Sequence, residues 1–309
     1  MKFDKQEILR VYTKCGGNKS ATARELGVPR TTLREWLDKL DAEGAEELKP
    51  KILYFDIETA PMLAEVWQLW DNNVALDQLD VDWYILTWSA KWANDPTVYN
   101  DKLTNYNDWE PGTENDYHIV KSLRDMLDQA SVVVGHNIVK FDIKKFNARC
   151  VVNGLPPPSP YKTVDTFQLA KAQFGFTSNR LDYLAKKLLG HGKIKTDHSL
   201  WKRCITGDKK AFEEMQRYND RDVAINEEVH KRLAPWDKRS PNFGVFANND
   251  VPTCSSIICG STNVELTDQT YKTNTSEFEI YRCKDCGTHM RGKKNLRSKE
   301  QMKNMLAGI

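Results

Sequence analysis

The chain has 309 residues, with 45 lysines and arginines against 43 aspartates and glutamates, so its net charge is only +2. A charge this small does not by itself indicate a nucleic-acid partner, so local charge has to provide any such indication. No apolar run approaches the roughly 20 residues that cross a bilayer, and the opening MKFDKQEILR lacks the apolar core of a secretory signal. We therefore expect a soluble intracellular protein without a membrane partner, and its length favours two or three domains.

Residues 4–40 carry the pattern of three short helices. In the third helix, Leu33 and Trp36 keep the spacing of one apolar face. Gly27 stands just before this helix and suits a tight turn. Two helices joined by a short glycine-containing turn predict a helix-turn-helix, and we place this small all-α domain at residues 1–45.

The stretch NKSATARELGVPRTTLREWLDKL, residues 18–40, resembles the DNA-binding helix-turn-helix of homeodomain-like and Fis-type bacterial and phage regulators. By this resemblance, the N-terminal half of the last helix would face base edges and phosphates. The residues of that half are Arg30, Thr31, Thr32 and Arg34. The alternative is a small helical module that binds another protein.

A polar segment, DAEGAEELKP, follows at residues 41–50 and is predicted to be a linker. From there to about residue 232 the pattern becomes mixed α/β. Strands are expected in KILYFDI, in WYILTWSAKW, around TVYND and in SVVVGHN, the first three as an antiparallel meander. Helices are expected at residues 117–130, 142–152, 167–174, 179–189 and 211–233.

Two acids stand at the end of the first of these strands. In YFDIET, Asp56 and Glu58 alternate with apolar neighbours, so both carboxylates project from one face of the strand. Two carboxylates this close repel each other unless a positive charge lies between them, and a hard divalent cation is the simplest such partner. The alternative is a strand end at which both acids are merely solvated.

Two further stretches supply acids. GHNIVKFD places Asp142 in the first turn of a helix, where the helix dipole alone also favours an acid. RYNDRDV places Tyr218 and Asp222 four residues apart, on one face of a helix. That spacing has no chemical meaning on its own, because such pairs meet in many helices that carry no site.

Together, DIET, HNIVKFD and YNDRD resemble, in this order, the three motifs of the DEDD superfamily of 3′–5′ exonucleases. The form is the tyrosine type, as in the proofreading domains of family B DNA polymerases, because the histidine of the other form would stand where Arg217 stands here. The resemblance implies an RNase H-like fold, a mixed sheet flanked by helices, over residues 50–233. It also implies a metal-dependent 3′–5′ exonuclease that hydrolyses the phosphodiester bonds of DNA.

The resemblance assigns a role to each motif residue. Asp56, Glu58 and Asp222 would hold one Mg²⁺ or Mn²⁺ that lowers the pKa of a bound water. Asp56 and Asp142 would hold a second ion that steadies the departing 3′ oxygen. Tyr218 would orient the attacking water, because its ordinary pKa near 10 makes orientation the safer role.

Two other polar residues lie near these motifs. Asp165, in TVDTF, is a fifth acid to which no motif in this sequence assigns a metal. His136 stands beside the second motif, and we expect it to have a structural hydrogen-bonding role.

Four of the seven cysteines cluster near the C-terminus, in the pairs Cys254-x4-Cys259 and Cys283-x2-Cys286, each followed by glycine. This distribution suits a reduced compartment and one metal site better than a disulfide framework. The segment resembles a zinc ribbon, a small β-rich domain with one structural Zn²⁺, which we place at residues 250–295 with a basic tail to 309. The first spacing is unusual, so Cys254 is the weakest ligand assignment and His289 is an alternative. Four unrelated buried thiols are the competing interpretation.

The three regions together predict a DNA exonuclease flanked by two nucleic-acid-binding modules. The partner would be nucleic acid, DNA in the first instance, in the cytoplasm of a bacterial cell or of a virus-infected host. Residues 287–309 contain six lysines or arginines and one glutamate, a tail that either contacts phosphates or is merely solvated. Two alternatives stay open: a non-catalytic DNA-binding regulatory protein on a nuclease fold, and an RNA-processing exonuclease.

Overall fold

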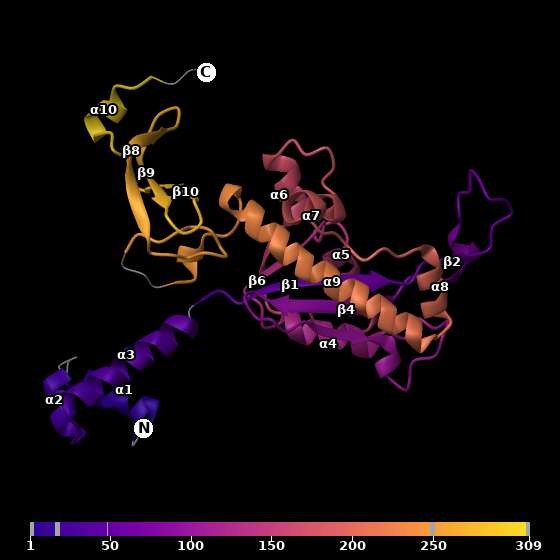
Figure 1. Cartoon of the computed structure of the whole chain (residues 1–309), viewed down its shortest axis with the longest axis horizontal. Coiled ribbons are helices and arrows are strands. Elements are labelled where there is room, and N and C mark those ends of the chain that lie inside the picture. Colours follow the sequence, from indigo (N-terminus) through magenta and orange to yellow (C-terminus); the bar gives the residue numbers. More distant parts are fainter. Residues whose placement is uncertain (1–2, 16–18, 48, 248–250, 307–309) are drawn as a thin grey trace. The chain divides into compact units, whose positions relative to one another are not determined.

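The computed structural model describes residues 3–15, 19–47, 49–247 and 251–306, except for the side chains at positions 5, 6, 9, 13 and 41–47 (Figure 1). The chain divides into two compact units, one of residues 1–49 with 244–250 and the other of residues 50–243 with 251–309. The three domain boundaries expected from the sequence stay predictions. Within the described residues, no helix is long and apolar enough to cross a membrane.

Three helices form the N-terminal unit: α1 (Lys5–Lys14), α2 (Lys19–Glu25) and α3 (Arg30–Glu47). All three contribute to one apolar core, which contains Ile8, Val11, Ala23, Leu26, Leu33, Leu37 and Leu40. Gly27 turns the chain between α2 and α3 with a φ of 63°, a left-handed conformation that glycine adopts without strain. The prediction of a linker over residues 41–50 is wrong for most of that segment, because α3 continues to Glu47. The alanine and glutamate residues of DAEGAEE favour helix, which explains the continuation.

The second unit is built on a mixed five-stranded sheet with the order β5-β4-β1-β6-β7. Its strands are β1 (Ile52–Thr59), β4 (Ile85–Trp92), β5 (Tyr99–Lys102), β6 (Val132–Gly135) and β7 (Lys162–Asp165). β1, β4 and β5 form the predicted antiparallel meander, in which Asp56 pairs with Ser89. β6 runs parallel to β1, and β7 runs parallel to β6. The predicted mixed sheet is thereby confirmed.

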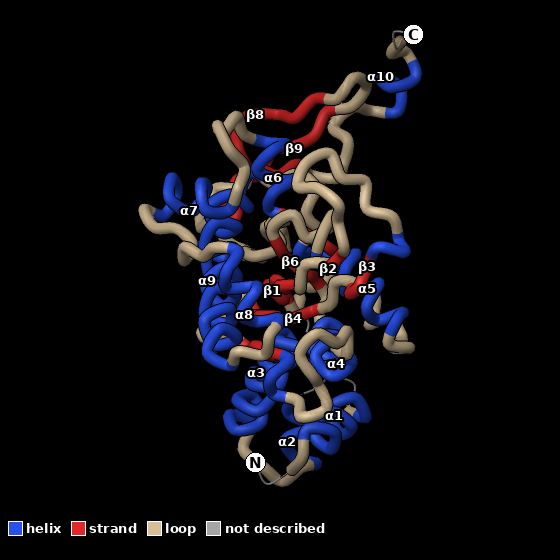
Figure 2. Tube along the Cα trace, turned by 90° about the vertical axis from the view of Figure 1, so that its right-hand side faces the viewer, coloured by secondary structure: helices blue, strands red, loops and turns tan. Residues whose placement is uncertain are grey.

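Helices cover both faces of this sheet. They are α4 (Tyr117–Leu127), α5 (Asp142–Val152), α6 (Thr166–Gln173), α7 (Leu181–Leu189), α8 (His198–Ile205) and α9 (Lys209–Leu233). α9 and α4 lie on opposite sides of the sheet (Figure 2). Side chains of β1 alternate between the two sides of the sheet. Phe55 and Ile57 pack in a core shared with α4 and α5. On the other side, the hydroxyl of Tyr54 lies 2.8 Å from Nδ1 of His230 on α9.

Most helix boundaries lie close to the predicted ones, and the differences have local causes. α7 begins at Leu181 rather than at residue 179, because the backbone of Arg180 is extended, with φ −65° and ψ 141°; the carbonyl of Asn179 accepts a hydrogen bond of 2.9 Å from His136 instead. α9 begins two residues before the predicted start, because the side chain of Asp208 accepts hydrogen bonds from two backbone N–H groups of its first turn. α8 was not predicted as a separate helix.

A long loop follows the first motif. It connects β2 (Leu63–Ala64) to β3 (Leu79–Val81) and projects from the second unit (Figure 1). Its side chains include two tryptophans in open solvent, of which Trp67 is 96% exposed. Short 3₁₀ segments occur at Leu76–Gln78, Leu103–Asn105, Ala234–Trp236 and Phe243–Val245.

The C-terminal region contains a three-stranded antiparallel sheet of β8 (Val264–Lys272), β9 (Glu277–Cys283) and β10 (His289–Arg291). The short helix α10 (Lys299–Lys303) follows it. The predicted small β-rich region is therefore confirmed. Its cysteines precede β8, end β9 and occupy the turn before β10.

Candidate active site

Three of the four predicted carboxylates meet near the end of β1. Asp56, Glu58 and Asp222 each offer a carboxylate oxygen within 4.8 Å of the other two. β1 presents the first two on one face because its side chains alternate, and α9 supplies the third. Asp222 is buried, whereas the two acids of β1 are partly exposed. The group is therefore open on one side to a ligand.

Asp142, the first residue of α5, lies beside this group. Its Oδ1 accepts a hydrogen bond of 3.2 Å from the backbone N–H of Ile57, the residue between the two acids of β1. Burial raises the pKa of Asp56 well above its ordinary range, and the charges of Asp142 and Glu58 raise it further. The structure thus brings all four predicted acids to one place, although Asp142 is outside the tightest group.

The acids lie together without enough positive charge to balance them. Burial, with the added charge of Asp222, raises the pKa of Glu58 to about 8, and burial raises the pKa of Asp142 to about 7. Oδ1 of Asp222 is buried and has no hydrogen-bond partner within the described residues. A buried carboxylate oxygen without a donor is costly unless a cation contacts it. The site therefore fits a hard divalent cation, which prefers carboxylate oxygens as ligands.

Lys193, in the segment between α7 and α8, is a site residue that sequence patterns did not indicate. Its Nζ lies 2.6 Å from Oδ2 of Asp222 and donates a hydrogen bond of 2.8 Å to the hydroxyl of Tyr218. Burial alone would lower the pKa of Lys193, but the charge of Asp222 and the hydrogen bonds to Asp222 and Tyr218 raise it above its ordinary value. The ammonium group therefore stays charged and offsets one of the carboxylates.

Tyr218 lies one helical turn before Asp222 on α9, as the motif predicted. Burial and the charge of Asp222 raise the pKa of Tyr218 above its ordinary value of 10, so the hydroxyl stays protonated at neutral pH. Its ring meets the ring of Trp201 edge-on, with centroids 6.1 Å apart. Lys193 and Trp201 together fix the tyrosine beside the acids.

Asn219 is a second site residue that was not predicted. Asn219 lies on α9 directly after Tyr218, and its side chain is buried. Its Nδ2 donates a hydrogen bond of 2.6 Å to Oδ2 of Asp56. This contact fixes the orientation of the Asp56 carboxylate. No periodic pattern marks Asn219, because its partner lies 163 residues away in the sequence.

Asp165 and His136 both form structural hydrogen bonds, the kind of role that was expected for His136. Asp165 caps α6, and its carboxylate also accepts hydrogen bonds from backbone N–H groups in the loop before α5. Nδ1 of His136 is 2.9 Å from the hydroxyl of Thr166, and burial lowers the pKa of His136 to about 4, so the ring is neutral. Both residues support the loop that leads to Asp142.

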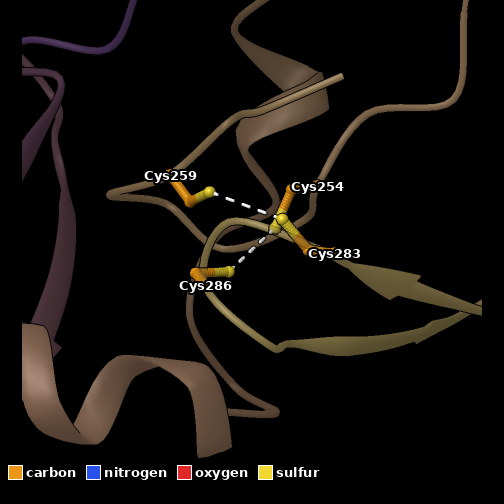
Figure 3. Close-up of side chains that lie close together, drawn as sticks. All are labelled: Cys254, Cys259, Cys283 and Cys286. Carbon is orange, nitrogen blue, oxygen red and sulfur yellow. Dashed lines mark hydrogen bonds between the residues drawn. The ribbon is translucent and has the colours of Figure 1, made fainter. Parts of the chain in front are cut away.

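The four predicted cysteines of the C-terminal region converge (Figure 3). Their sulfur atoms all lie within 4.8 Å of one another. The Sγ atoms of Cys254 and Cys286 are 3.5 Å apart, and those of Cys259 and Cys283 are 3.8 Å apart. A disulfide bond is about 2.05 Å long, whereas sulfurs around a tetrahedral zinc with bonds of about 2.3 Å are roughly 3.8 Å apart. The donor set therefore fits Zn²⁺, and the exposed His289 on β10 is not part of the group.

The four residues predicted to contact DNA lie in the first turns of α3. Arg30, Thr31 and Arg34 are exposed, and Thr32 is partly exposed. Arg34 forms an exposed ion pair of 3.6 Å with Asp38. These side chains are accessible to a ligand, and their contact with DNA stays a prediction.

Comparison with known families assigns two parts of the chain. The family described as "Bacterial regulatory protein, Fis family" matches residues 2–40, and the "RNase_H superfamily" matches residues 95–234. The chain combines a Fis-type helix-turn-helix with an RNase H-like domain. Both predicted folds are thereby confirmed. The RNase H-like match includes Asp142 and Asp222 but begins after β1, so Asp56 and Glu58 lie outside it.

Among solved structures, the family B DNA polymerase from the hyperthermophilic archaeon Pyrobaculum calidifontis is similar, with 14% sequence identity and a TM-score of 0.45. The similarity covers 60% of this chain and 25% of the polymerase chain. An identity and a TM-score this low transfer no activity. A comparison with curated proteins gave no match.

Proposed function

We propose that the RNase H-like domain is a metal-dependent 3′–5′ exonuclease that hydrolyses phosphodiester bonds of DNA. The observation that carries this proposal is the group of Asp56, Glu58 and Asp222, with Asp142 beside it and a buried oxygen of Asp222 without a partner within the described residues. A fold alone does not determine a function, so the proposal rests on this site. The 3′–5′ direction comes from the motif resemblance.

The four acids would hold the metal ions. Asp56, Glu58 and Asp222 would bind one Mg²⁺ or Mn²⁺, and Asp56 and Asp142 would bind a second. When bound, such ions lower the pKa of a coordinated water and stabilise the charge on the departing oxygen. The acids must be ionised to act as ligands, so metal binding releases the protons that their raised pKa values retain.

The neighbouring side chains would position the reacting groups. Tyr218 would orient the attacking water through its hydroxyl, and its raised pKa supports orientation over proton removal. Lys193 holds that hydroxyl in place through its hydrogen bond of 2.8 Å. Asn219 holds Asp56 in one orientation, so the ligand geometry is set before the metal binds.

The two flanking regions would help to hold the substrate. We propose that the helix-turn-helix binds DNA through the exposed start of α3, where Arg30 and Arg34 provide positive charge. The four cysteines would hold one structural Zn²⁺, because thiolates select Zn²⁺ whereas carboxylates suit Mg²⁺ or Mn²⁺. A sheet of only three strands has little core, so the zinc would supply much of its folding free energy.

End-labelled oligonucleotides test the reaction and its direction. With Mg²⁺ or Mn²⁺, 5′-labelled single-stranded DNA should shorten one nucleotide at a time, and 3′-labelled DNA should release its label at once as a mononucleotide. Faster cleavage of RNA than of DNA of the same sequence would favour the RNA-processing alternative. If neither metal supports cleavage of any substrate, the result would favour the alternative of a non-catalytic DNA-binding protein.

A further inference from the structure

The segment from β2 to β3 forms a structured arm, which we define as residues 63–81 (Figure 1). The two strands pair at the base of the arm, and Gln78 connects its two sides there. Nε2 of Gln78 donates a hydrogen bond of 3.1 Å to the carbonyl of Glu65, and Oε1 of Gln78 accepts one of 2.9 Å from the N–H of Ala75. The arm is therefore a folded element with a defined base.

The outer part of the arm exposes large apolar side chains. Trp67 is 96% exposed, Trp70 is 80% exposed and Leu76 is 90% exposed. Leu69 and Val74 are exposed as well. Contiguous exposed apolar side chains usually mark an interaction surface, and tryptophan is enriched among the residues that supply most of the binding energy of such surfaces. These side chains therefore indicate a binding surface on the arm.

A pocket of about 530 Å³ lies within the arm and combines apolar walls with two carboxylates. Val66, Trp67 and Val74 line it, and so do Asp71 and Asp77. Both aspartates are exposed, and neither forms an ion pair within the part of the chain that the structure describes. A tryptophan ring attracts a cation over its face, and a carboxylate pairs with the same cation. The pocket therefore suits an arginine or lysine side chain, which has an apolar stem and a positive end.

The charge of the arm discriminates among the possible partners. Residues 63–81 contain four acids and no lysine, arginine or histidine. This negative charge repels the phosphates of a nucleic acid, and it also repels the arm of a second copy of the chain. A positively charged partner is attracted instead, which favours both the rate and the specificity of association.

We propose that the arm binds a basic segment of another protein, with an arginine or lysine side chain of that segment in the pocket and apolar side chains against Trp70 and Leu76. No residue of the pocket belongs to the acid group of β1 and α9, so the proposal goes beyond the proposed exonuclease and does not depend on it. The arm would bring the nuclease domain to a protein that itself carries positive charge, as proteins that bind nucleic acids do.

The full chain labelled with 5-fluorotryptophan tests this contact by ¹⁹F NMR. Trp67→Phe and Trp70→Phe assign the two signals of the arm, and the other tryptophans among the nine of the chain report on other surfaces. The probe is a short synthetic peptide that alternates arginine with leucine and glycine. This peptide should shift the signals of Trp67 and Trp70 and leave the other signals unchanged. Its affinity should fall as the salt concentration rises, because salt screens exposed charges.

Matched variants separate the pocket from the rest of the arm. Asp71→Asn with Asp77→Asn removes both carboxylates of the pocket and should weaken peptide binding about 3- to 30-fold. Trp67→Ala should weaken it about 5- to 30-fold through the loss of the cation–π contact. The control is Asp80→Asn, which removes one charge from β3 outside the pocket and should bind nearly as tightly as the parent. All four side chains are exposed, so the variants should fold as the parent does.

Other results would overturn the proposal. If the arginine peptide shifts neither signal, or binds the Asp71→Asn, Asp77→Asn variant as tightly as the parent, the pocket does not hold a basic side chain. Equal shifts with a peptide that has glutamate in place of arginine would show that charge does not select the partner. Shifts caused by an oligothymidylate in EDTA, and not by the arginine peptide, would make the arm a nucleic-acid contact. Signals that change with protein concentration alone would make it a contact between two copies of the chain.

Discussion

The ammonium group of Lys193 lies 2.6 Å from the carboxylate of Asp222. This contact joins the segment between α7 and α8 to the centre of α9, at the point where the acids of β1 also meet. One ammonium group balances only one carboxylate, so the metal-free site keeps strong repulsion among the others. The raised pKa of Glu58, about 8, results from burial and from this uncompensated charge.

This repulsion predicts how the stability of the metal-free protein depends on pH. The folded pKa of Glu58, about 8, exceeds its ordinary value of 4.5, so the folded state disfavours the ionised form. The stability that this group contributes is full below its unfolded pKa and is lost as the pH rises through about 8. In buffer without Mg²⁺ or Mn²⁺, calorimetry should show the unfolding temperature falling from about pH 4.5 to about pH 8, the interval between the unfolded and folded pKa values of Glu58. The unfolding temperature of the Glu58→Gln variant should fall less over the same pH range. Identical curves of unfolding temperature against pH for the two proteins would contradict the assigned repulsion.

Tyr218→Phe removes a hydroxyl without removing a metal ligand. We expect the cleavage rate to fall by about 10²- to 10⁴-fold, the usual effect of a positioning or acid–base group. Affinity for Mn²⁺, measured by titration calorimetry, should stay close to that of the parent. The control is Tyr183→Phe, which removes the same atom from α7 outside the acid group. A Tyr218→Phe variant as fast as the parent would reduce the tyrosine to a packing residue.

Arg30→Ala with Arg34→Ala tests the helix-turn-helix. Each phosphate contact that is lost lowers the slope of log affinity against log salt by about one, so the double variant should bind duplex DNA more weakly and with a shallower slope. Cleavage of short single strands should be unaffected, because these residues would position the chain on DNA rather than act in catalysis. Lys14→Ala is the control, since Lys14 is paired with Glu25 at 2.9 Å. An unchanged slope would favour a protein-binding helical module.

Protein prepared without a chelator should contain one tightly held zinc. Cys283→Ser should release it and unfold the C-terminal sheet, because Cys283 is fully buried among the other three thiols. Cys15→Ser, in the N-terminal unit, should retain the metal. Elemental analysis measures the zinc, and hydrogen exchange locates the loss of structure. A zinc-free parent, or a Cys283→Ser variant that retains its zinc, would contradict the zinc site.

Local sequence patterns sufficed to predict much of the site. Asp56 and Glu58 alternate along a short strand, and Tyr218 and Asp222 lie one turn apart on a helix, so each pair shares a face by geometry alone. The order of the three motifs resembles that of a known family, and this resemblance indicated that the stretches form one site. The family comparisons confirm the RNase H-like and Fis-type folds. They leave the roles of the individual residues to experiment.

The residues that the sequence analysis missed all act through contacts between distant parts of the chain. Lys193 and Asn219 meet partners on other elements, and neither belongs to a repeat or a spacing that marks it. A pocket lined by Trp83, which precedes β4, and by Trp201 of α8 likewise forms only when the fold brings these two segments together. α3 continues past its predicted end for a different reason, because the helix propensity of DAEGAEE outweighs its polarity.

The most direct measurement of the central claim is a time course of 5′-labelled single-stranded DNA with Mg²⁺, with Mn²⁺ and with EDTA, for the parent, Asp56→Asn and Asp222→Asn. Both substitutions keep the shape of the side chain and remove a charged ligand, so folding should persist while cleavage falls below detection. Asp220→Asn is the matched control, because Asp220 lies on α9 but binds Ser89 and Asn100 instead of joining the acid group. The account predicts single-nucleotide shortening by the parent and by the control with either metal, and none with EDTA. Undiminished cleavage by folded Asp56→Asn or Asp222→Asn, or cleavage by the parent in EDTA, would contradict it.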